Sequence, residues 1–137
     1  MTDKPRVGVI GLGYVGLPLS LTFAEAGVPV LGLDAVQSKV DQVNRGESYI
    51  EDVPSERLRP LTEAGLISAT TSWDAMRAVE AVVICLPTPL TEHREPDLSA
   101  VRGAAASLAQ RQRTRPRVGL ERTTTAVSYT QNRAPAP

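Results

Sequence analysis

The sequence has very few of the side chains that build disulfides and metal sites. Its 137 residues include one cysteine, Cys85, and one histidine, His93. These counts exclude an intrachain disulfide, a cysteine-rich metal cluster and a multi-histidine zinc site made by this chain alone. No apolar run approaches the roughly 18 residues of a transmembrane helix, and the first residues lack the features of a signal peptide. We therefore expect a cytoplasmic, reduced chain with no metal and no membrane partner.

An excess of charge of one sign is also absent. Fifteen basic residues balance fifteen acidic ones, which argues against nucleic acid as a partner. Apolar residues make up 42% of the chain, enough for the core of one domain. The composition changes near residue 111, after which six arginines accompany a single acidic residue, Glu121. We predict one domain over 5–115, an aberrant, disordered basic and Pro/Ala-rich tail over 116–137, and no substrate domain.

Short apolar runs alternate with helical patterns along the first part of the chain. Strands are predicted over residues 7–10, 28–33, 67–70 and 81–86. Helices are predicted over residues 14–26, 36–44, 55–64, 73–78 and 97–110, with Ser55 as an N-cap. This alternation predicts an α/β fold with a Rossmann-type doubly wound parallel sheet. With about four to five strands the sheet would be incomplete, and we expect the strand after Cys85 to be poorly formed.

A glycine-rich turn follows the first predicted strand and opens the first predicted helix. It has the spacing G-x-G-x-x-G and consists of Gly11, Leu12, Gly13, Tyr14, Val15 and Gly16. In this context Gly11 permits the tight turn, Gly13 lets a diphosphate approach the backbone, and Gly16 allows the helix to pack closely on the strand. The amides and dipole at the helix N-terminus then favour a bound phosphate.

An acidic residue stands where such a site needs one. Asp34 ends the second predicted strand, 21 residues after Gly13. A carboxylate there accepts hydrogen bonds from a ribose diol and repels a 2′-phosphate, which favours NAD over NADP. The alternative interpretation is a purely structural glycine turn with a surface aspartate. The fingerprint also occurs in FAD-binding proteins, and the residues alone leave that alternative open.

Longer stretches resemble a known family. Residues 9–19 and 85–89 resemble the N-terminal NAD-binding domain of the UDP-glucose/GDP-mannose dehydrogenases. Residues 48–53 and 87–99 are similar to the UDP-N-acetylhexosamine 6-dehydrogenase branch. The resemblance covers about residues 5–110 and implies NAD as the cofactor.

The resemblance also assigns roles to individual residues. It implies that residues 11–16 hold the diphosphate of NAD and that Asp34 binds the adenosine ribose. It places Lys39 beside that ribose, with a solvated helix lysine as the alternative, and Thr88 near the cofactor, with a simple turn residue as the alternative. Thr123 aligns with a cofactor-side threonine, although Arg122 stands where the family has serine.

The family's chemistry goes beyond what this chain contains. Members of the family oxidise a primary alcohol of a nucleotide sugar to a carboxylate by two hydride transfers to NAD, with a cysteine thiolate capturing the aldehyde. The resemblance places that cysteine, the substrate-binding groups and the dimerisation element in later parts of the family's chain. Cys85 ends an apolar strand and is interpreted as a buried hydrophobe.

No catalytic residue is therefore predicted in this sequence. We expect an NAD-binding part of a nucleotide-sugar 6-dehydrogenase that is inactive alone and meets a UDP-sugar only together with the remaining half of such an enzyme. One alternative is a degenerate Rossmann module or interaction fragment without turnover. Another is a Rossmann enzyme that uses FAD, or a nucleotide sugar without oxidation.

Overall fold

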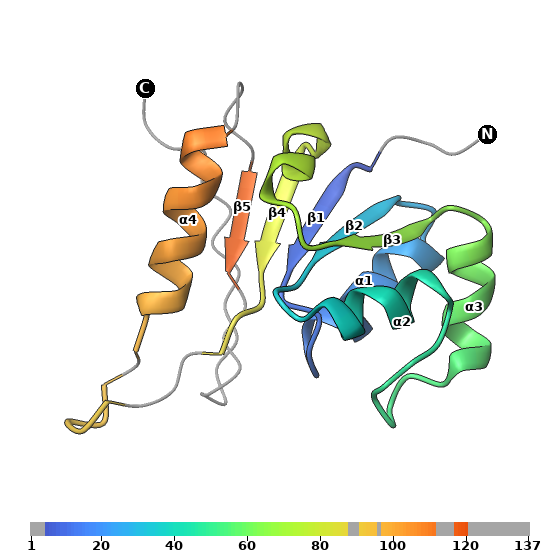
Figure 1. Ribbon diagram of the computed structural model, residues 1–137, viewed down its shortest axis with the longest axis horizontal. Helices are drawn as coiled ribbons and strands as arrows, with labels where there is room; N and C mark the ends of the chain where they lie inside the picture. Colours follow the sequence, from blue (N-terminus) through green and yellow to red (C-terminus); the bar gives the residue numbers. More distant parts are fainter. Residues whose placement is uncertain (1–4, 88–90, 96, 112–116, 121–137) are drawn as a thin grey trace.

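The described residues form one parallel sheet with helices on both faces (Figure 1). The computed structural model describes residues 5–87, 91–95, 97–111 and 117–120. The strands are β1 (Val7–Ile10), β2 (Val30–Leu33), β3 (Ile67–Thr70), β4 (Ala81–Ile84) and β5 (Arg117–Leu120). The helices are α1 (Gly16–Glu25), α2 (Gln37–Asn44), α3 (Ser55–Glu63), the 3-10 helix η1 (Trp73–Ala78) and α4 (Ser99–Arg111). The predicted α/β fold with a doubly wound parallel sheet is thereby confirmed.

The sheet separates two hydrophobic clusters. Successive strand residues point to opposite faces, so Val9 belongs to the cluster under α1, α2 and α3, whereas Ile10 belongs to the cluster under η1 and α4. Leu17 and Leu21 of α1 are completely buried in the first cluster. Helices on both faces explain why the strands are so apolar, because each strand is covered twice.

The strand order is β3-β2-β1-β4-β5, and every pairing is parallel. The chain therefore runs outward from β1 to β3 and then crosses to the other side of β1 to form β4. At such a switch point the loops after β1 and β4 diverge and leave a crevice at the carboxyl ends of the strands. The fold thus places the loops after four strands at one edge of the sheet.

Several predicted bounds differ from the structure: β2 begins at residue 30 rather than 28, and β4 ends at residue 84 rather than 86. The residue that caps α3 is Pro54, and Ser55 is the first helical residue. The Ser55 hydroxyl instead accepts a hydrogen bond from the backbone N–H of Ser48, at 3.0 Å. Ser55 therefore secures the preceding loop rather than the helix. The first helix begins at Gly16, two residues later than expected, because residues 14 and 15 complete the turn.

The sheet also continues past the expected end of the domain. β5 pairs with β4 in parallel over all four residues, from Arg117 against Ala81 to Leu120 against Ile84. Parallel pairing uses backbone N–H and C=O groups, so the strand that we expected to be poorly formed is paired along its whole length. Residues 117–120, which we expected in the tail, therefore belong to the sheet. The rest of the predicted tail, 121–137, lies outside the described residues. Among the described helices, none is both long and apolar enough to cross a membrane.

Candidate functional site

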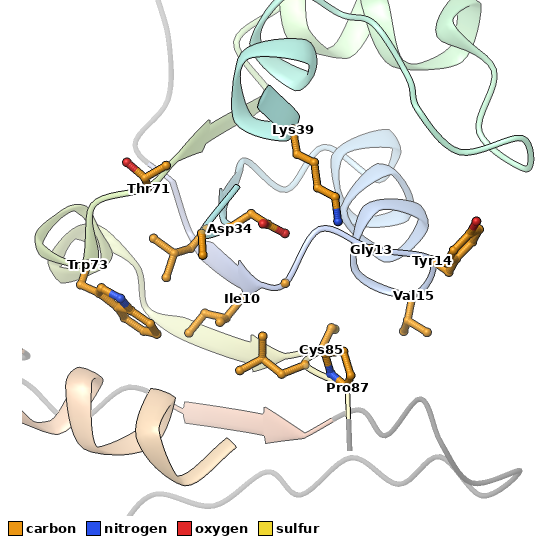
Figure 2. A pocket seen from close by; sticks show the side chains of 14 residues that line it. Ile10, Gly13, Tyr14, Val15, Asp34, Lys39, Thr71, Trp73, Cys85 and Pro87 are labelled. Carbon is orange, nitrogen blue, oxygen red and sulfur yellow. The ribbon is translucent and has the colours of Figure 1, made fainter. Parts of the chain in front are cut away.

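A pocket of about 760 Å³ opens at the carboxyl ends of the strands (Figure 2). Its walls come from the glycine turn after β1, from residues 33–35 and Lys39 around the end of β2, from Thr71 and Trp73 after β3, and from residues 85–87 after β4. These segments are distant in the sequence and meet because parallel strands end at the same edge. The crevice expected from the strand order is therefore a real cavity.

The three glycines of the turn are needed for different reasons. Gly11 has a φ of +94°, and a Cβ there would lie 2.6 Å from the carbonyl oxygen of Cys85. A Cβ on Gly16 would lie 1.6 Å from the carbonyl oxygen of Gly11. A Cβ on Gly13 would meet nothing within 4 Å. The fold itself therefore demands glycine at 11 and 16, whereas Gly13 lines the pocket and no protein atom fills the space that its Cβ would take.

The N-terminus of α1 adds a partial positive charge to this turn. Val15 caps the helix without a side-chain hydrogen bond, and no acidic residue lies in the first helical turn. Helix N-termini without a side-chain acceptor are suited to bind anions, because their N–H groups and the helix dipole both favour negative charge. Gly13, Tyr14 and Val15 line the pocket at this end.

The Asp34 carboxylate is fixed by two backbone hydrogen bonds. Its Oδ2 accepts from the N–H of Leu12 and its Oδ1 accepts from the N–H of Val36, both at 2.9 Å. These bonds tie the carboxylate to the glycine turn and to the start of α2. Each carboxylate oxygen has a second lone pair, so both can still accept from a ligand hydroxyl in the pocket. Lys39 extends its ammonium group towards the same space (Figure 2).

Tyr49 is a site residue that sequence reasoning missed. Its hydroxyl donates to the carbonyl oxygen of Leu12 at 2.5 Å, and the Lys39 ammonium lies 5.7 Å from the centre of its ring. Burial, and secondly the negative charge of Asp34, raise the pKa of Tyr49 above its ordinary value, which keeps the hydroxyl protonated as a donor. The sequence signal was its place in the segment 48–53 that resembles the UDP-N-acetylhexosamine branch, but that resemblance assigned no role to Tyr49.

Leu12 is thereby held at both of its backbone polar groups. Asp34 takes its N–H and Tyr49 takes its C=O. Its side chain is 1% exposed and packs over Gly32, where a Cβ would lie 2.7 Å from a Leu12 methyl group. Leu12 therefore anchors the glycine turn from behind, and it is not among the residues that line the pocket.

The predicted site residues divide into three groups. Gly11, Gly13, Tyr14, Val15, Asp34 and Lys39 line the pocket together. Leu12 and Gly16 lie behind the wall and shape it. Thr88 and Thr123 lie outside the described residues. Cys85 is 4% exposed, as expected for a buried hydrophobe. Within the described ranges no three metal-ligating side chains come together.

The comparison with protein families decides the identity of this domain. The model of the UDP-glucose/GDP-mannose dehydrogenase family, NAD binding domain, matches residues 5–135. The chain belongs to this family. Its cofactor is therefore NAD, which settles the choice between NAD and FAD that the glycine fingerprint left open. The geometry fits NAD, because the space at Gly13 and the paired oxygens of Asp34 suit a diphosphate and a ribose diol.

Relatives of the family share most of this chain. A UDP-N-acetyl-D-mannosamine dehydrogenase of Salmonella typhi is 38% identical over 104 residues, which are 75% of this chain and 24% of the relative. An NDP-N-acetyl-D-galactosaminuronic acid dehydrogenase of Ralstonia nicotianae is 34% identical over 108 residues, 78% of this chain and 25% of the relative.

A solved structure agrees with these relatives. The UDP-D-ManNAc dehydrogenase of Pyrococcus horikoshii superposes with a TM-score of 0.78 at 32% identity, over 86% of this chain and 28% of that chain. The chain spans about a quarter of the length of the curated relatives it matches.

Proposed function

We propose that this chain is the NAD-binding part of a nucleotide-sugar 6-dehydrogenase, which oxidises the 6-hydroxyl of a UDP-N-acetylhexosamine to the uronate. The names of the relatives support this substrate class, since the Salmonella and Ralstonia enzymes act on N-acetylated hexosamine derivatives. Bound NAD supplies the hydride acceptor for both oxidation steps. The observation that carries the proposal is the Asp34 carboxylate, which the glycine turn itself orients towards the pocket.

The chain's own residues then have distinct tasks in binding. The amides around Gly13, Tyr14 and Val15 receive the diphosphate at the N-terminus of α1. Asp34 accepts hydrogen bonds from the adenosine ribose and excludes a 2′-phosphate, and Lys39 lies beside the same ribose. We carry Thr88 and Thr123 over as cofactor-side residues on the resemblance alone. The domain would extend over 5–115, with the β5 residues added to its sheet.

We propose further that the chain has no turnover by itself. Its only cysteine is 4% exposed within the cluster under α1 and therefore does not serve as the thiolate nucleophile. A UDP-sugar would bind only together with the part of such an enzyme that this chain does not span. The role of the chain would be to hold and orient the cofactor.

Calorimetric titration of the purified chain with NAD tests this proposal. We expect saturable heat with NAD and at least about tenfold weaker binding of NADP, because the 2′-phosphate meets Asp34. D34R should abolish the NAD signal. D41R makes the same charge change at an exposed position of α2 outside the pocket and should bind like the unaltered chain.

Two results would contradict the proposal. A chain that is folded by circular dichroism yet gives no NAD heat would remove the binding role. Formation of NADH from UDP-N-acetylglucosamine or UDP-N-acetylmannosamine by the pure chain would remove the claim that it is inactive alone.

A further inference from the structure

Trp73 is the only tryptophan of the chain and lies in the wall of the pocket. It opens η1, two residues after Thr71, in the segment that follows β3. Figure 2 shows its indole turned towards Ile10, at the end of the pocket away from Gly13 and Tyr14. A large aromatic ring therefore forms the wall opposite the glycine turn.

The indole is held in place from behind. Trp73 is half-buried and packs against the cluster that lies beneath η1 and α4, which includes the fully buried Met76. A ring already supported by core packing loses little further side-chain freedom when a flat group stacks on it. This arrangement distinguishes Trp73 from Tyr14, which is 82% exposed at the other end of the pocket.

The ligand groups proposed above determine what reaches Trp73. A diphosphate at Gly13 and a ribose at Asp34 define a direction along the pocket, and a base attached to that ribose continues beyond Asp34. The lining in that direction comes from Ala35, Thr71 and Trp73. These residues carry no charge, and an uncharged wall with an aromatic ring is suited to the face of a purine.

We propose that the Trp73 indole is the platform for the adenine ring of NAD, and that Trp73 is a positioning residue for the adenosine half of the cofactor. The inference rests on the proposed NAD site and adds a residue outside the glycine fingerprint. Because no other tryptophan is present, the fluorescence of Trp73 reports directly whether the adenine end of the pocket is filled.

Fluorescence titration of the full chain with fragments of NAD tests the placement. AMP and ADP-ribose, which contain adenine, should change the Trp73 emission as NAD does, whereas nicotinamide mononucleotide should not. Emission that responds to nicotinamide mononucleotide but not to AMP would overturn the proposal. So would calorimetric binding of NAD and AMP that leaves the emission unchanged, and that result would leave the proposed NAD function intact.

Substitutions give a second, independent measurement. W73A should weaken AMP and NAD binding about 5- to 150-fold, the range for loss of one base–aromatic stack, and W73F should keep most of the affinity. F23A removes a half-buried aromatic residue from α1, which packs on the other face of the sheet, and should not change the affinity.

The variants also show whether Trp73 only packs the core. If W73A does not fold, W73F and the fragment titration still decide the question. Unaltered NAD affinity in folded W73A would overturn the proposal, whereas absence of NAD binding to the folded parent chain would overturn the proposed function as well.

Discussion

Replacement of Gly13 by alanine should separate binding of the cofactor from folding. A Cβ at this position meets no protein atom within 4 Å, and Gly13 does not have a positive φ. Alanine there restricts the unfolded chain more than the folded one, so G13A should leave the stability unchanged or raise it by about 0.4–1 kcal/mol. The same methyl group would occupy space that a diphosphate needs.

The loss of NAD affinity in G13A can be estimated from the cost of one extra methyl group in a close contact. That cost is about 1–3 kcal/mol, which corresponds to about 5- to 150-fold in Kd. G16A provides the opposite case in the same turn. Its Cβ would lie 1.6 Å from the Gly11 carbonyl oxygen, so the turn or α1 must shift, and we expect a loss of stability of about 1–3 kcal/mol or more.

Urea unfolding followed by circular dichroism, with NAD titration calorimetry on the same samples, measures both effects. We expect G13A to fold with parental stability and bind NAD weakly, and G16A to unfold at markedly lower urea. Parental NAD affinity in folded G13A would refute the argument that the open space at Gly13 is reserved for the diphosphate. Parental stability in G16A would refute the packing argument.

Two further predictions concern contacts between distant parts of the chain. Y49F removes the hydroxyl that donates to the Leu12 carbonyl and should lower the stability by about 1 kcal/mol at neutral pH. The pKa of Tyr49 is raised in the folded state, so the stability that this hydrogen bond contributes is present below pH about 10 and is lost as the pH rises towards the folded value. In urea unfolding at increasing alkaline pH, the stabilities of Y49F and the parent should therefore converge. A constant difference in stability would contradict the assignment. Asn44 of α2 donates to the carbonyl of Ala69 and accepts from its N–H, at 3.0 and 2.9 Å, on β3, one of the two edge strands of the described sheet. N44D keeps the acceptor but places a carboxylate oxygen against the Ala69 carbonyl, so it should lower the stability by about 1–3 kcal/mol. It should also favour association of chains through the β3 edge. Urea unfolding and sedimentation would detect these two effects, and parental stability of N44D would show that the β3 edge does not need this side chain.

Much of the fold could be predicted because its signals are local. The first strand, the glycine turn, the first helix, the second strand and Asp34 follow one another within 28 residues, from 7 to 34. Each element shows its own period, and the glycine spacing is set by contacts within the turn. The fold class followed from the same kind of alternation along residues 7–110, and the cofactor followed from the family resemblance over about residues 5–110.

The remaining features depended on tertiary contacts. The Tyr49 hydroxyl is 37 residues from its acceptor at Leu12, and Trp73 reaches the pocket only because β3 and β1 end at the same edge of the sheet. β5 joined the sheet although the sequence predicted a poorly formed strand there. The sequence alone determined the order of the elements and the glycine turn at Gly13, because both depend on residues that are neighbours in the chain. Only the packing of helices and loops around the sheet decided which distant side chains support the glycine turn and complete the wall of the pocket.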